Sequence, residues 1–165
     1  MSARVLLAAT LSISLLAGCA KVAPTPTWPL TTQQTANYRT ARIRLDAPSH
    51  RELRLLLADT DAERELGLGQ RDRLPEEGML FVIDPAAPTS IWMKGMQFSL
   101  DILWLKQGRV VQVEQAVPLA TPTDPTPPTY GPTQAVDAVL EIASGQAEEL
   151  GLGVGSTVTL LGLER

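Results

Sequence analysis

The sequence has few of the side chains that most often carry out chemistry. One cysteine, Cys19, and one histidine, His50, occur among its 165 residues. A single thiol excludes an intrachain disulfide, and the acidic residues are too scattered for a metal cluster or a calcium loop. A nucleophile elbow and a Ser-x-x-Lys pair are also missing, so familiar acyl-transfer motifs are absent. We therefore expect no metal site and no cofactor.

Basic residues are also in short supply. The chain has 14 Lys and Arg against 18 Asp and Glu, which gives a formal net charge of −4 at pH 7. Proteins that bind a phosphate backbone carry a clear excess of positive charge on one face. This composition therefore argues against nucleic acid as a partner.

The strongest pattern lies at the N-terminus. Arg4 supplies a minimal positive region, Val5 to Leu16 form a short apolar stretch, and Leu16-Ala17-Gly18-Cys19 closes it. This ending resembles the bacterial lipobox. The resemblance implies that residues 1–18 are a lipoprotein signal peptide and that the Cys19 thiol carries a lipid anchor. An ordinary secretory signal or an uncleaved membrane helix is the alternative.

The localisation and domain organisation follow from that pattern. Residues 19–39 are rich in proline and threonine and almost uncharged, which is typical of a tether that stays extended. Residues 40–165 fit one β-rich domain, because domains cluster near ~100 to 150 residues. We expect a protein of the bacterial cell envelope, lipid-anchored to the membrane with its domain outside the cytoplasm.

Short apolar or alternating runs predict strands throughout this domain. Thr60 and Glu63 match a capping box, which predicts a short helix ending at Gly67 or Gly69. Without strand–helix alternation, we expect an α+β domain, either a mainly antiparallel β-sheet or a partly closed barrel with one or two short helices. The proline-rich residues 118–132 are expected to be a surface loop. The predicted strands lie near residues 42–45, 52–58, 78–83, 91–94, 100–105, 109–115, 135–142 and 156–161.

Five side chains are candidates for a ligand-binding site: Arg71, Trp92, Lys94, Asp101 and Glu141. Asp101 and Glu141 interrupt apolar strands, and a carboxylate beside buried surface usually needs a cationic or backbone partner. One hypothesis is a structural network in which Asp101 and Glu141 form ion pairs with Arg71 and Lys94. A second has these cations gripping an anionic ligand while Trp92 supplies a stacking face. A third has the two carboxylates acting as general acid and base, as in glycoside hydrolysis.

These residues stand in blocks that resemble a known family. In order, they are Glu65-Leu66-Gly67-Leu68 with Arg71, Gly78-Met79-Leu80-Phe81, Trp92-Met93-Lys94, Leu100-Asp101-Ile102, and Val139-Leu140-Glu141-Ile142 followed by Gly145. From about residue 52 to 161 the chain resembles the family named domain of unknown function 192. The family typically has methionine where Gly69 stands and Asn-Thr where Gly95-Met96 stand. The resemblance implies a small, mostly β domain, often secreted or membrane-attached, with no established activity or cofactor.

Taken together, these patterns predict a lipid-anchored envelope protein with a small binding or interaction domain. Its ligand could be a small molecule, a cell-wall component or a protein. Two alternatives stay open. One is an envelope hydrolase that cleaves a glycan or peptide through a carboxylate pair, and the other is a structural protein of envelope assembly. Whether the protein is an enzyme is left undecided.

Overall fold

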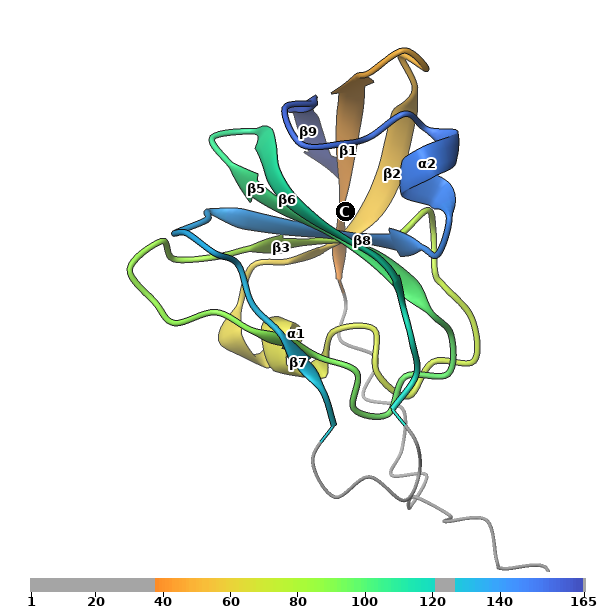
Figure 1. Cartoon of the computed structure of the whole chain (residues 1–165), viewed down its shortest axis with the longest axis vertical. Coiled ribbons are helices and arrows are strands. Elements are labelled where there is room, and N and C mark those ends of the chain that lie inside the picture. The colour runs from red at the N-terminus through yellow and green to blue at the C-terminus, as the bar shows by residue number, and fades with distance from the viewer. Residues whose placement is uncertain (1–37, 121–126, 165) are drawn as a thin grey trace, which may run out of the picture. The chain divides into compact units, whose positions relative to one another are not determined.

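A computed structural model of the chain describes residues 38–120 and 127–164. The predicted signal peptide, Cys19 and nearly all of the predicted tether lie outside these residues. The described part forms the following elements (Figure 1): β1 (Arg39–Asp46), β2 (Glu52–Ala58), α1 (Asp61–Leu66), β3 (Met79–Val82), β4 (Ile91–Trp92), β5 (Leu100–Lys106), β6 (Arg109–Val117), β7 (Thr129–Tyr130), β8 (Ala138–Ala143), α2 (Gln146–Glu149) and β9 (Thr157–Glu164).

Seven of the strands close into a barrel in the order β1-β2-β3-β8-β5-β6-β9. Neighbouring strands run antiparallel except β2 and β3, which are parallel. Two short helices complete the domain. The predicted class, a mainly antiparallel β fold with one or two short helices, is confirmed, and the barrel is closed rather than partly open.

The proline-rich segment 118–132, predicted as a surface loop, is half-buried or exposed over its described residues and carries one short strand. It contains β7, which pairs with β4 in a separate two-stranded sheet, Ile91 opposite Tyr130 and Trp92 opposite Thr129. Residues 121–126 of this segment lie outside the described part. Pairing with β7 holds β4, and therefore Trp92, in a fixed position beside the barrel.

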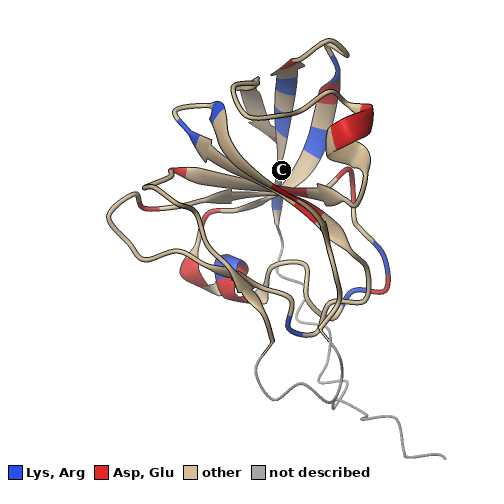
Figure 2. Cartoon of the chain, in the orientation of Figure 1, with Lys and Arg blue, Asp and Glu red and all other residues tan. Residues whose placement is uncertain are grey.

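Buried and exposed side chains alternate along most of β1, and this pattern explains how the strand forms part of the barrel wall. Ile43 and Leu45 are buried, whereas Arg42 and Arg44 between them are exposed, as expected for side chains that alternate across a strand. Figure 2 shows the resulting blue bands along β1 and β2. Arg42 pairs with Glu164 at 2.8 Å. Such exposed ion pairs stabilise a fold by about 1 kcal/mol at most. Most of the stability of this part of the barrel therefore comes from the apolar side chains buried on the other face of the strand.

The wall of the barrel has apolar side chains on both faces. On β5, Leu103 and Leu105 belong to the barrel interior, whereas Ile102 and Trp104 belong to a second apolar cluster on the outside. All four side chains are buried. A strand covered on both faces reads as a continuous apolar run, which explains the sequence of β5. The outer cluster also contains Leu68, Met79, Phe81, Met93, Val136 and Val139.

Gly78 lets β3 start close against β8. Its φ angle is +143°, and a Cβ atom built there would lie 2.2 Å from the carbonyl oxygen of Glu141. Only glycine tolerates both the backbone angle and the close approach. The Gly-Met-Leu-Phe block is therefore explained by packing against the strand that carries Glu141.

The two helices are short, and one of them packs against the barrel core. Ala147 of α2 is fully buried and belongs to the interior cluster, so α2 covers part of the barrel core. In α1, Ala62 is exposed and Leu66 half-buried, and none of the residues of this helix is fully buried. Over the described residues, neither helix has the length and apolar character needed to cross a membrane.

Candidate functional site

Asp101 is buried within the barrel wall and bonded to backbone. Its side chain is 0% exposed. Oδ1 accepts a hydrogen bond from the amide of Ala116 at 2.8 Å, and Oδ2 accepts one from the amide of Ala147 at 2.9 Å. These bonds tie β5 to β6 and to the first turn of α2. Asp101 therefore holds the fold together through backbone donors.

Glu141 is the second buried carboxyl, and it lies in an apolar setting. Its direct neighbours across the strands are Met79 on β3 and Ile102 on β5, both in the outer cluster. Trp104 lies diagonally across on the same face, within reach of a long side chain. Removal from water disfavours the charged form, and this burial raises the pKa of Glu141 to about 8. The side chain is therefore mostly protonated at pH 7.

The two carboxyls do not form a pair. Asp101 lies opposite Ile142, an interior residue, and Glu141 lies opposite Ile102, an outer-cluster residue. Directly opposed residues point to the same face of a sheet, and successive residues point to opposite faces. Asp101 and Glu141 therefore project to opposite sides of the barrel wall. This geometry does not favour the general acid and base hypothesis.

The predicted ion-pair network is also corrected. Within the described part of the chain, the ion pairs involve none of Arg71, Lys94, Asp101 and Glu141. Asp101 is bonded to amides, and burial keeps Glu141 neutral instead of pairing it with a cation. The two cations lie over aromatic rings.

Arg71 rests on an aromatic residue that the sequence analysis missed. The guanidinium carbon of Arg71 lies 5.4 Å from the centre of the Tyr38 ring, a distance at which the ring face attracts a cation. Tyr38 lies within the predicted tether at 19–39, where a lone aromatic residue carries no periodic signal. Burial raises the pKa of the Tyr38 hydroxyl, with the nearby Arg71 acting in the opposite direction.

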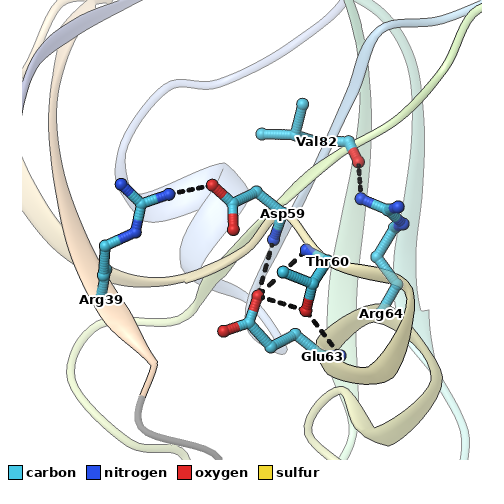
Figure 3. Close-up of polar contacts among 6 residues, drawn as sticks. All are labelled: Arg39, Asp59, Thr60, Glu63, Arg64 and Val82. Carbon is cyan, nitrogen blue, oxygen red and sulfur yellow. Dashed lines mark hydrogen bonds and ion pairs between the residues drawn. The ribbon is translucent and has the colours of Figure 1, made fainter.

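Helix α1 holds Tyr38 in place. The Tyr38 hydroxyl donates toward the carbonyl oxygens of Glu63 and Gly67, at 3.2 and 3.3 Å. The predicted capping box fixes this helix (Figure 3): the Glu63 amide donates to Thr60 Oγ1 at 3.3 Å, and the Thr60 amide donates to Glu63 Oε2 at 3.0 Å. An ion pair between Arg39 and Asp59 joins the start of β1 to the entry of the helix.

Lys94 and Trp92 make a second pair of the same kind. The Lys94 Nζ atom lies 4.8 Å from the centre of the Trp92 ring. Both side chains are exposed, Trp92 to 49%. Met93, between them, is buried in the outer cluster. The buried methionine anchors this segment, so the lysine and the tryptophan are presented to solvent.

Backbone contacts bring the two pairs onto adjoining loops. The Gln70 amide donates to the Gly95 carbonyl oxygen at 2.9 Å. A Cβ atom on Gly69 would lie 3.3 Å from the carbonyl oxygen of Lys94, so the two loops touch at this point. We call the set of Tyr38, Arg71, Trp92 and Lys94 the cation–aromatic surface.

The structure thus separates the five predicted site residues into two groups. Arg71, Trp92 and Lys94 lie on adjoining loops with Tyr38 added, whereas Asp101 and Glu141 are buried in the wall on opposite faces. Across the described residues, no group of three or more His, Cys, Asp or Glu is placed to hold a metal ion.

The cation–aromatic surface offers two cations and a half-exposed indole. This combination suits binding of an anion with an adjacent flat or apolar face.

Comparison with known proteins identifies the family. Residues 43–160 match the family described as uncharacterized ACR, DUF192, so the chain belongs to the DUF192 family. The resemblance seen in the sequence blocks is thereby confirmed. No curated protein matches the chain.

Two solved structures are similar to this chain. One, from Sinorhizobium meliloti and described as a proposed transcription regulator, is 28% identical with a TM-score of 0.63, covering 74% of this chain and 95% of that one. The other, a protein of unknown function from Novosphingobium aromaticivorans, is 29% identical with a TM-score of 0.62, covering 76% of this chain and 88% of that one. The barrel is therefore a fold that this chain shares with both proteins.

Proposed function

We propose that this chain is a lipid-anchored protein of the bacterial cell envelope whose barrel domain binds an anionic ligand. The observation that supports binding is the cation–aromatic surface. Its two cations lie on adjoining loops, and each rests on an aromatic ring. A cation held over a ring is already partly oriented, so less side-chain freedom is lost when it meets an anion.

The chemistry of this surface limits the kind of ligand. Arg71 offers a planar fork that matches a carboxylate or phosphate, and Lys94 offers a point charge. The half-exposed ring of Trp92 provides a face for an apolar or sugar surface. An anionic glycan, an acidic peptide or a phosphorylated headgroup has these features.

Binding at this surface can be tested by thermal melting of the detergent-solubilised chain with anionic cell-wall fragments, acidic peptides and sugar phosphates. A ligand at ~100 times its dissociation constant should add about 2.7 kcal/mol to the free energy of unfolding, a shift of a few degrees in Tm. We expect Arg71→Ala and Trp92→Ala to abolish the shift while the transition stays cooperative.

Arg44→Ala is the matched control, because Arg44 is an exposed arginine on β1 away from the adjoining loops. It should leave the ligand-induced shift unchanged. An equal shift in Arg71→Ala and in the unaltered protein would refute binding at this surface.

The anchoring half of the proposal is supported by the Leu-Ala-Gly-Cys ending and by the fact that Cys19 is the single cysteine of the chain. Replacing Cys19 with serine removes the thiol that would be acylated. We expect Cys19→Ser to release the protein from the detergent phase or leave it unprocessed. Phase separation and mass spectrometry of the N-terminus measure both effects. A Cys19→Ser protein that is still cleaved before residue 19 and still enters the detergent phase would contradict the anchor.

The other candidate functions have less support. A hydrolase built on Asp101 and Glu141 would need both carboxyls on one face, and their strand register places them on opposite faces. A structural role in envelope assembly would predict one consistent neighbour in crosslinking of the anchored protein. The transcription-regulator description belongs to the Sinorhizobium meliloti protein, and a net charge of −4 does not favour extending it to this chain.

A further inference from the structure

We infer that the cation–aromatic surface binds the anionic phospholipid headgroups of the membrane that carries the anchor. The barrel would then rest on the bilayer through Arg71, Trp92 and Lys94. This inference depends on the proposed function, because it names the ligand of the same surface. Three features of the described residues support it: the place where the chain enters the domain, the local charge, and the exposed tryptophan.

The N-terminal segment enters the domain at this surface. Tyr38 is the first described residue, and its ring lies under the guanidinium of Arg71. Cys19, the proposed point of lipid attachment, precedes Tyr38 by 38 − 19 = 19 residues. The described chain therefore begins beside Arg71, so a lipid attached at Cys19 would keep this end of the barrel within reach of the bilayer.

The local charge is opposite to that of the whole chain. Residues 67–75 and 89–98, the parts of the adjoining loops that carry Arg71, Trp92 and Lys94, contain Arg71, Arg73, Lys94 and one acid, Asp72. Three positive charges less one negative charge give +2, in a chain of net charge −4. Of these side chains, Arg71 is half-buried and the others are exposed. The two acids later in the first loop, Glu76 and Glu77, are paired with Arg54 of β2 and with Arg51, which directly precedes β2. An anionic leaflet attracts basic side chains at its surface, so charge complementarity favours contact through these loops.

The acidic helix α1 restricts how the domain could approach. Figure 2 shows red segments on α1, at the end of the barrel that also carries the adjoining loops. Asp61 and Glu65 of this helix are exposed. We therefore expect the side bearing Trp92 and Lys94 to face the lipid, with α1 turned away from it.

Trp92 provides the apolar part of the contact. It is 49% exposed, although β4 is held in place by pairing with β7. Tryptophan is enriched where headgroups meet acyl chains, because its ring is apolar with one polar edge. Lysine beside it can lay its methylene stem on the apolar layer and keep its ammonium among phosphates. An exposed Trp-Lys pair, with the tryptophan on a strand paired to β7, therefore suits a lipid interface.

The test uses the full chain anchored in vesicles and measures quenching of Trp92 by brominated phosphatidylcholine. Vesicles contain phosphatidylcholine alone or with phosphatidylglycerol. Subtracting the signal of Trp92→Phe removes the contribution of the other two tryptophans. We expect Trp92 to be quenched only when phosphatidylglycerol is present, and less so as salt is added.

Charge variants make the test specific. Arg71→Gln and Lys94→Gln should each lower the ratio of docked to undocked protein about fivefold. Arg44→Gln, on β1 away from these loops, should leave the ratio unchanged. Unaltered melting of Arg71→Gln would show that the loss is not an effect on folding.

The outcomes separate this inference from the proposed function. Equal quenching in both vesicle types, or no quenching of Trp92 in either, would overturn lipid docking. If docking fails but a soluble anion still raises Tm in an Arg71-dependent way, the binding proposal stands and the lipid ligand is wrong. If neither docking nor a shift is seen, both are wrong.

Discussion

Glu141→Gln should stabilise the barrel at alkaline pH and flatten the dependence of its stability on pH. Burial raises the pKa of the carboxyl to about 8, against an ordinary value of 4.5. Between these values the folded chain keeps a proton that the unfolded chain releases. Stability therefore falls as pH rises, by about 1.4 kcal/mol for each pH unit. Glutamine is a neutral mimic of the protonated acid, so the variant should gain about 4 kcal/mol at pH 8.

Urea unfolding at a series of pH values from 4 to about 9 measures this effect. The unaltered protein should lose stability across the range, and Glu141→Gln should lose much less. Glu52→Gln is the matched control, because Glu52 is an exposed carboxylate at the start of β2. Parallel profiles for Glu141→Gln and the unaltered protein would show that Glu141 ionises normally in the fold.

Asp101→Ala is expected to destabilise the barrel by about 3 to 5 kcal/mol. The carboxylate is fully buried and accepts from the amides of Ala116 and Ala147. Its removal loses two hydrogen bonds to a charged group, at about 1.5 to 3 kcal/mol each, and leaves the buried Ala147 amide without an acceptor. Asp101→Asn should lie between, because its carbonyl oxygen can serve one amide while its NH₂ group faces the other.

Asp84→Ala is the comparison for this prediction. Asp84 also accepts from a backbone amide, that of Ala86 at 2.9 Å, but it is exposed. Water can replace its oxygen, so we expect a loss below about 1 kcal/mol. Faster hydrogen exchange at the Ala147 amide in Asp101→Ala would confirm the contact with α2. Equal losses in Asp101→Ala and Asp84→Ala would mean that burial of Asp101 has no energetic importance.

Local patterns were sufficient to predict most of the elements. The alternation of Arg42, Ile43, Arg44 and Leu45 predicts β1, and the Thr60–Glu63 capping box predicts α1, because both signals lie within a few neighbouring residues. The pairing of β5 with β6 is equally local, since the two strands are adjacent in the chain and joined by a turn at Gly108. Each of these elements depends on contacts that are short-range in sequence.

Closure of the barrel could not be predicted from such local patterns. The parallel pairing of β2 with β3 and the insertion of β8 between β3 and β5 join strands that are distant in sequence. A strand's own periodicity shows which residues share a face, but not how it aligns with another strand. The grouping of Asp101 with Glu141 failed for this reason, because their relation depends on the register between β5 and β8.

The cation–aromatic surface was predicted in part. No amphipathic pattern accounts for Arg71, Trp92 and Lys94, which makes them candidates, and the structure places all three on adjoining segments. Tyr38 could not be selected, since it stands at the edge of a segment without periodicity. Its role follows only from the position of α1, whose carbonyl groups hold the phenol beneath Arg71.

The position of β1 between β2 and β9 has a mechanical consequence. In an N-terminally anchored protein, tension enters the domain at Arg39 and runs along β1. The strand is paired with β2 from Arg39 to Arg44 and with β9 from Thr40 to Asp46. Ladder hydrogen bonds lie perpendicular to such a pull, so both ladders are loaded in shear and their bonds share the force. The topology therefore suits a domain that has to stay folded while it is pulled through its N-terminal strand.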